Sequence, residues 1–181
     1  MTCIVGFVDN KDVYMGGDSA GNSDYDLIVR SDPKVFINEG FIFGFTGSFR
    51  MGQLLQYSFC PPKHHESVDL FEYMVTDFID AVRECLKAFG FAEKHNEAER
   101  GGTFMVGYKG RLFTIYSDYQ VGENSVPYMA IGCGDSYALG ALYSMPKAIK
   151  PEKKVQLALE AAEQFSGGVR GPFIIKKLER K

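Results

Sequence analysis

The first eighteen residues constrain the fold of this chain more than any other stretch. Apolar side chains fill positions 4–8, the polar residues Asp9-Asn10-Lys11 follow, and a second apolar run covers positions 12–16. Val, Ile, Phe and Tyr suit a pleated, half-buried surface, and a short polar connection between two such runs predicts a β-hairpin. We therefore expect the N-terminus to lie on a strand, although chain ends are ordinarily frayed.

Thr2 lies at the start of this hairpin, with Met1 before it. Removal of Met1 would place a hydroxyl and a free α-amine on the same residue. The reference pKa of an α-amine is roughly 7.7–8.0, so part of it is a neutral base near pH 7. A hydroxyl beside a base is an activated nucleophile. We therefore interpret Thr2 as a candidate nucleophile, on the condition that Met1 is removed, because a retained Met1 would abolish the base.

The next part of the chain predicts a second hairpin and two helices. Residues 19–34 form a polar, turn-rich connection, and apolar runs at 34–37 and 41–45 flank the turn Asn38-Glu39-Gly40. Ser48 is expected to cap a helix that stops at Cys60-Pro61-Pro62. A long helix is expected to begin at Ser67 and to end at Gly90. Its apolar residues form one wide stripe.

The remainder of the chain completes an α+β pattern. A charged connection at 92–100 precedes strands at 102–108, 111–116 and 128–131. One helix is expected after Gly134-Asp135 and a second from Pro151, and a last strand covers 172–178. This order predicts a four-layer αββα sandwich, in which helix pairs cover two packed antiparallel sheets. We expect one domain over residues 1–181, because 181 residues with 45% hydrophobic content can form one substantial core.

Three further residues could support catalysis by Thr2. Lys34 could be the cation that lowers the pKa of the Thr2 hydroxyl and amine, and Asp18 could hold that buried lysine. Gly47 lies at a strand-to-helix corner, where a backbone N–H can stabilise an oxyanion. Taken singly, Thr2 is an ordinary strand residue, Asp18 a turn residue and Lys34 a surface cation. Their joint spacing favours the catalytic interpretation.

Together these residues resemble the catalytic set of the proteasome β-type N-terminal nucleophile (Ntn) hydrolases, and most of all the bacterial HslV-type peptidases. Asp18 follows Thr2 by 16 positions and Lys34 follows it by 32, which are the family's separations. Residues 130–134 resemble the family's A-x-G-S-G stretch, and residues 163–167 its D-x-x-S-G element. The resemblance spans the whole chain and adds Cys133, Glu163 and Ser166 to the implied site.

The chain departs from the family pattern in three places. Cys133 stands where the family usually has a serine, and a thiol is the weaker hydrogen-bonding group. Glu163 replaces an aspartate and so reaches further by one methylene. Residues 48–51 lack the usual small residues and aspartate after the corner glycine, which concerns the substrate pocket more than the chemistry.

The resemblance implies a threonine-type endopeptidase that hydrolyses peptides or unfolded proteins within a homo-oligomeric ring. Whether an unfoldase ATPase is its partner stays open. It also implies a pocket for the side chain before the scissile bond, with apolar walls at Ala20, Val35, Phe45 and Phe49. We expect cleavage after Leu, Phe or Tyr. Two alternatives stay open: a catalytically silent ring subunit of the same fold, and an Ntn amidase of a small molecule.

Composition and motifs argue against several other classes. A net charge of -3 and a pI near 5.6 provide no basic field for nucleic acid. No apolar run approaches the roughly 20 residues that span a bilayer, and a secretory signal pattern is absent. Scattered cysteines without C-x-x-C spacing favour the cytoplasm. His64-His65 is interpreted as a loop and not as a metal site, and no cofactor is expected.

Two cysteines have alternative interpretations. Cys3 could itself act as the nucleophile if both Met1 and Thr2 were removed, but the spacings to Asp18 and Lys34 favour Thr2. Strand alternation should also turn Cys3 to the opposite face of its strand. Cys133 could otherwise be a small buried hydrophobe.

Overall fold

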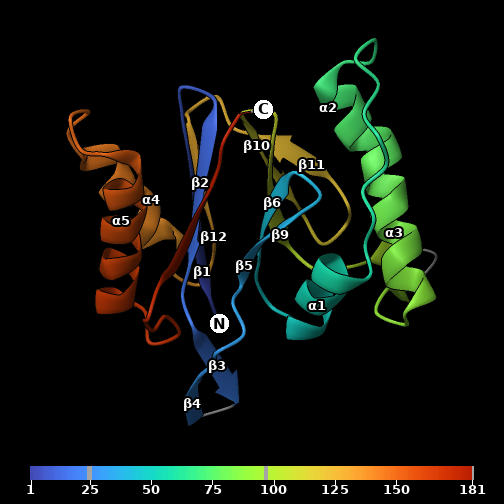
Figure 1. The fold of residues 1–181 in the computed structure, drawn as a ribbon. Helices are drawn as coiled ribbons and strands as arrows, with labels where there is room; N and C mark the ends of the chain where they lie inside the picture. The colour runs from blue at the N-terminus through green and yellow to red at the C-terminus, as the bar shows by residue number, and fades with distance from the viewer. Residues whose placement is uncertain (24–25, 96–97, 181) are drawn as a thin grey trace.

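The computed structural model describes residues 1–23, 26–95 and 98–180. Two antiparallel sheets lie face to face, and helices cover the outer side of each sheet (Figure 1). The predicted four-layer αββα sandwich is confirmed. Every predicted strand is found, with bounds shifted by at most two residues.

The two sheets use strands from both halves of the chain. The first has the order β12-β1-β2-β13, with strands Tyr128–Gly132, Cys3–Asp9, Asp12–Gly17 and Ile174–Leu178. The second has the order β11-β10-β9-β6-β5, with strands Val121–Glu123, Arg111–Ile115, Phe104–Tyr108, Phe41–Phe45 and Val35–Asn38. The first sheet is covered by helices α4 (Asp135–Ser144) and α5 (Pro151–Phe165). The second sheet is covered by helix α1 (Phe49–Tyr57) and by one long helix that consists of α2 (Leu70–Tyr73), η1 (Met74–Phe78) and α3 (Ile79–Ala88).

The β1–β2 hairpin has the two-residue turn that the sequence indicates. Asp9 pairs with Asp12, so only Asn10 and Lys11 connect the strands. Both residues have positive φ, 49° and 71°. Such a turn matches the right-handed twist of the strands that it joins. The turn therefore fixes the register of β1 against β2, and with it the position of Thr2.

Strand alternation sorts the apolar side chains of β1 and β2 into different layers. Cys3, Val5 and Phe7 pack under α4 and α5. Ile4 packs between the two sheets, together with Val13 and Met15 of β2. Residues of one strand thus alternate between two cores, as the period of two requires.

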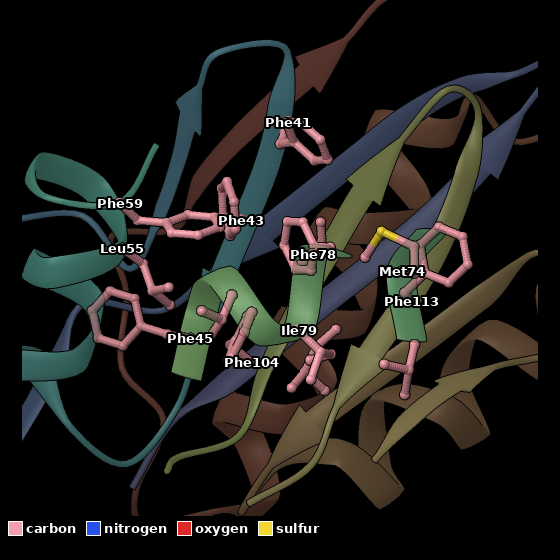
Figure 2. Close-up of a cluster of buried hydrophobic side chains, with 14 of the residues drawn as sticks. Phe41, Phe43, Phe45, Leu55, Phe59, Met74, Phe78, Ile79, Phe104 and Phe113 are labelled. Atoms are coloured by element: carbon pink, nitrogen blue, oxygen red, sulfur yellow. The ribbon is translucent and has the colours of Figure 1, made fainter. Parts of the chain in front are cut away.

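A large aromatic cluster fills the space between the second sheet and its helices. Figure 2 shows Phe41, Phe43 and Phe45 of β6 beside Phe78 of the long helix and Phe59, which follows α1. The rings of Phe43 and Phe59 meet edge to face with centroids 6.2 Å apart. Aromatic pairs of this kind contribute beyond their buried area. This cluster anchors the second sheet to α1 and α3.

One difference from the sequence-based expectation lies in the connection 19–34. It contains a hairpin of β3 (Ala20–Ser23) and β4 (Asp26–Val29), with residues 24 and 25 outside the described part. Leu27, Ile28 and Val29 are exposed by 40%, 59% and 53%. Because β4 buries neither face, it lacks the alternation of apolar and polar residues by which a half-buried strand is detected.

A second difference concerns the long helix. Asp69 is its N-cap and accepts hydrogen bonds from the amides of Phe71 and Glu72. The predicted start at Ser67 was therefore wrong, because the helix begins three positions later, at Leu70. The apolar residues Phe71 and Val75 are 37% and 41% exposed and lie outside the buried stripe. Each follows a buried residue by one position and therefore lies about 100° around the helix from it.

The remaining differences are short elements and one aromatic side chain. The expected charged connection at 92–100 contains β7 (Glu93–His95) and β8 (Ala98–Arg100), and residues 96 and 97 lie outside the described part. With β11, these strands have three residues each, too few for a detectable period. Phe165, at the end of α5, is 66% exposed and stacks on Tyr137 instead of the sheet.

The aromatic cluster generates a stability prediction. Phe78→Ala should lower the free energy of unfolding by about 3–5 kcal/mol, because Phe78 is fully buried and its removal leaves a cavity. Tyr143→Ala is the matched control, since Tyr143 is 84% exposed, and should change it by less than about 0.5 kcal/mol. Urea unfolding followed by circular dichroism measures both. Equal effects of the two substitutions would contradict this account of the core.

Candidate active site

The fold buries Thr2 between the two sheets. Thr2 directly precedes β1, and alternation turns its side chain to the same face as Ile4, which packs between the sheets. Thr2 is only 3% exposed. Its side chain therefore faces the start of β5 in the opposite sheet.

Lys34 connects the two sheets at this point. It directly precedes β5 and is 2% exposed. Its Nζ donates one hydrogen bond to Thr2 Oγ1 and another to Asp18 Oδ1, both at 2.9 Å. The structure thus brings together Thr2, Asp18 and Lys34, which lie far apart in the sequence.

Asp18 is held by backbone amides as well as by Lys34. The amide of Cys3 donates to Oδ1 at 3.0 Å, while those of Ala20 and Arg170 donate to Oδ2 at 2.9 and 3.4 Å. These donors and Lys34 fix the orientation of both carboxyl oxygens. Asp18 is therefore a buried side chain held in one position beside Lys34.

The environment also changes the pKa of Lys34. Burial lowers the pKa of its ammonium, because desolvation disfavours the charged form, and the charge and hydrogen bond of Asp18 offset this only in part. A lysine with a lowered pKa exchanges a proton with a neighbouring hydroxyl more readily. The arrangement can therefore lower the cost of deprotonating Thr2 Oγ1.

Cys133 and Ser166 lie on the main-chain side of Thr2. The Thr2 nitrogen, which is a peptide amide here because Met1 precedes it, donates to Cys133 Sγ at 3.3 Å. Cys133 Sγ in turn lies 3.4 Å from the Thr2 carbonyl oxygen, and Ser166 Oγ donates to the same sulfur at 3.5 Å. The thiol is exposed and not buried as a small hydrophobe would be. Cleavage before Thr2 would leave the α-amine beside this thiol.

The other cysteine of the hairpin is unsuited to nucleophilic chemistry. Cys3 is fully buried under α4 and α5, on the opposite face from Thr2. Burial raises the pKa of its thiol well above the ordinary value of 9.0. Because only the thiolate is a good nucleophile, the geometry favours Thr2 over Cys3.

Two glycines shape the space around Thr2. Gly47 has φ +84°, which favours glycine, and it lies at the exposed corner between β6 and α1, where a Cβ would meet nothing within 4 Å. Within the described residues its amide has no hydrogen-bond partner. A Cβ on Gly132 would lie 2.2 Å from the Thr2 carbonyl oxygen and 3.3 Å from Thr46 Oγ1. Gly132 therefore lets the corner at 46–47 approach Thr2.

Glu163 is not in contact with Thr2. Its Oε1 accepts a hydrogen bond from the Gly171 amide at 2.9 Å. Gly171 follows Arg170, whose amide binds Asp18. Glu163 thus reaches the site indirectly, through the loop that supplies one donor to Asp18.

The candidate pocket residues are mostly buried. Ala20, Val35 and Phe45 are at most 4% exposed, and Phe49 is partly exposed. The Phe49 ring meets the Phe45 ring edge to face, with centroids 5.6 Å apart, and the Arg30 guanidinium lies 3.8 Å from the centre of the Phe49 ring. Phe49 therefore contacts both the buried Phe45 and the charged Arg30.

Several groups in this site are not indicated directly by the sequence. The amides that bind Asp18 carry no residue-specific signal, because any amino acid except proline supplies them. Arg30 and Asp32 form a bidentate ion pair, at 2.7 and 2.6 Å, beside Phe49, and the sequence does not indicate Arg30 as a residue of the site. Gly132 and Gly168 were detectable in principle as clustered glycines, and a Cβ on Gly168 would collide with Met1.

The described residues lack two other kinds of feature. They contain no group of three His, Cys, Asp or Glu side chains that could hold a metal ion. They also contain no helix of sufficient length and apolarity to cross a membrane. His64, one of the adjacent histidines, hydrogen-bonds with the Val68 carbonyl at 2.8 Å.

Comparison of the chain with protein-family models and with curated proteins finds no match.

Solved structures, in contrast, match the fold over nearly the whole chain. BPH from Thiobacillus denitrificans superposes with a TM-score of 0.81 at 17% identity, covering 99% of both chains, and was also solved in complex with epoxomicin. HslV from Trypanosoma brucei gives 0.71 at 18% identity, covering 98% of this chain and 99% of that one. Anbu from Hyphomicrobium sp. strain MC1 gives 0.66 at 19% identity, covering 100% and 84%. The chain has the fold of the proteasome-type Ntn hydrolases.

Proposed function

We propose that this protein is a threonine-type peptidase that acts through Thr2 once the peptide bond before Thr2 has been cleaved. The observation that carries the proposal is the position of Lys34 Nζ, 2.9 Å from both Thr2 Oγ1 and Asp18 Oδ1 in a buried site. A nucleophile held by a cation, which a third group orients, is the arrangement that nucleophilic catalysis requires. A structural ion pair does not need the hydroxyl.

In the proposed reaction, the α-amine of Thr2 takes the proton of the Thr2 hydroxyl. Oγ1 then attacks the peptide carbonyl, while Lys34 stabilises the developing negative charge on Oγ1. The Gly47 amide donates to the oxyanion. The amine returns the proton to the leaving amine, and water hydrolyses the acyl-enzyme and regenerates Thr2. The thiol of Cys133 and the hydroxyl of Ser166 orient the α-amine.

We also infer a homo-oligomeric ring, which receives peptides or unfolded proteins in the cytoplasm. The ring is what the resemblance to HslV-type peptidases implies, and the fold shared with HslV and Anbu supports it. Four free cysteines support a reducing compartment. An unfoldase ATPase is the partner that would supply unfolded substrates to such a chamber.

The alternative of a catalytically silent ring subunit depends on whether Met1 is removed. With Met1 in place, the Thr2 hydroxyl donates to the Met1 carbonyl, and the Thr2 nitrogen is an amide without basicity. A chain that keeps Met1 would retain the fold and the Lys34 contacts but lack the base. Intact mass spectrometry distinguishes the two forms directly.

Substitution of Thr2 tests the nucleophile. On protein whose intact mass shows Thr2 at the N-terminus, Thr2→Ala should reduce peptide hydrolysis by roughly a thousandfold or more, because the nucleophilic Oγ1 is lost together with the Cγ2 methyl group. Thr2→Ser is the matched control and should retain measurable turnover. Epoxomicin should add its mass to the wild type and not to Thr2→Ala. An assembled, correctly processed wild type with no activity would support the silent subunit instead.

Substitution of Lys34 separates catalysis from stability. Lys34→Ala should lower kcat by roughly a hundredfold or more, since the cation at Oγ1 is lost. Removal of one partner of a buried ion pair can cost about 3–5 kcal/mol, but three amides still hold Asp18. We therefore expect a smaller loss of unfolding free energy than for Phe78→Ala, measured by urea unfolding. A loss as large as that of Phe78→Ala would mean that the pair is mainly structural.

The pocket predicts the residue before the cleaved bond. Cleavage after Leu, Phe or Tyr should exceed cleavage after Lys or Arg by about tenfold or more, because burying an apolar side chain contributes about 1.5–3 kcal/mol. Arg30 opposes a basic side chain, and Asp32 is already paired with Arg30. Fluorogenic peptides that differ only at this position measure the ratio. Arg30→Gln would free Asp32 and should raise cleavage after Lys and Arg, whereas a basic preference of the wild type would refute this pocket.

A further inference from the structure

A cavity of about 380 Å³ lies at the end of the sheets opposite to Thr2. Its walls come from the β1–β2 turn at Lys11, the β9–β10 turn at Lys109 and Gly110, and the C-terminal residues 178–180. In Figure 1 the C-terminus and the β1–β2 turn lie at one end of the molecule, and the N-terminus lies at the other. The cavity is therefore separate from the candidate active site.

Three cations surround this cavity. Lys11, Lys109 and Arg180 line it, and they also line an adjoining hollow of about 440 Å³, so the two spaces are continuous along these side chains. The whole chain has a net charge of -3. A cluster of positive charge at one end is therefore a local feature and not a consequence of composition.

The charges of these cations are not neutralised by neighbouring acids. Over residues 1–23, 26–95 and 98–180, none of the three side chains takes part in an ion pair. Glu179, which also lines the cavity, is bound by Lys177 at 3.1 Å. Glu66 lines only the adjoining hollow. Lys109 Nζ lies 2.8 Å from His64 Nδ1, a ring nitrogen that can accept from the ammonium without removing its charge.

Apart from Glu179 and two glycines, the remaining residues that line the cavity are apolar or aromatic. Ile37, Tyr108 and Leu178 line it, and Ile37 is 47% exposed. The Tyr108 ring is stacked on Phe41, with centroids 3.8 Å apart. Apolar surface with a few convergent charged groups is typical of small-molecule sites, which have volumes of about 300–1,000 Å³.

We propose that this cavity binds a small organic carboxylate with an apolar body. The apolar body would lie against Ile37, Tyr108 and Leu178. The carboxylate would lie among Lys11, Lys109 and Arg180, where charge-assisted hydrogen bonds are stronger than neutral ones. A neutral or cationic compound of the same shape would leave the three cations unpartnered. The proposal is independent of any chemistry at Thr2.

Calorimetric titration of the full-length protein tests this proposal with 4-phenylbutyrate as the probe. Because a charge-assisted hydrogen bond contributes about 1.5–3 kcal/mol, the uncharged 4-phenylbutyramide should bind at least about tenfold more weakly. Equal affinities for acid and amide would refute the role of the cations. Absence of binding at millimolar 4-phenylbutyrate would refute the site.

Two double variants locate the binding. Lys11→Asn with Arg180→Gln should weaken 4-phenylbutyrate binding by about tenfold or more, and asparagine tolerates the positive φ of Lys11. Lys147→Gln with Lys150→Gln removes the same charge from exposed positions outside both spaces and should leave the affinity unchanged. Thr2→Ala should also bind like the wild type. An equal loss in both double variants would show a net-charge effect and overturn the assignment, and circular dichroism confirms that each variant is folded.

Discussion

The contact of Lys34 with both Thr2 and Asp18 is the interaction on which the organisation of this site depends. Lys34 directly precedes β5 of the second sheet, whereas Thr2 directly precedes β1 and Asp18 directly follows β2 in the first. A buried ammonium would be costly without partners. Its two hydrogen bonds therefore hold the facing ends of the sheets in one arrangement, and the same arrangement places a cation on the candidate nucleophile.

The carboxylate side of this contact depends on main-chain geometry. Asp18 receives amides from β1, from the start of β3 and from the loop before β13. The last of these is held by Glu163 through Gly171. Asp18 is thus fixed by segments from both ends of the chain, so its position depends on the correct packing of all of these segments. A local error in any of these segments would misplace Lys34.

The two ends of the sheets differ in their chemistry. Thr2, Lys34 and Asp18 at one end are buried and mutually paired. Lys11, Lys109 and Arg180 at the other end lie on turns and on the C-terminal segment, around an open apolar cavity. Strands β1 and β2 connect the two ends directly. The buried cation is satisfied by its partners within the fold, whereas the exposed cations have no acidic partner in the described part of the chain and are available to a ligand.

The layers, the β1–β2 and β5–β6 hairpins and the grouping of Thr2, Asp18 and Lys34 follow from the sequence alone. Periods of two and of three to four residues are local properties that burial imposes on each strand and helix, so strands such as β1 and β6 and the helix α5 could be predicted. The spacing of Thr2, Asp18 and Lys34 identified their grouping through resemblance. The hairpin β3–β4 could not be found because β4 is exposed and carries no alternating pattern, and the three-residue strands could not be found because they are too short to show a period.

Only the tertiary structure decided how the residues of the site meet. Glu163 was grouped with Thr2 by motif, but it binds the Gly171 amide, because its position on α5 faces that loop. The cover formed by Arg30 over Phe49 depends on β4 ending beside α1, and the cations of the opposite cavity come from three separate segments. Contacts between residues distant in the chain arise from packing, and packing leaves no periodic trace in the sequence.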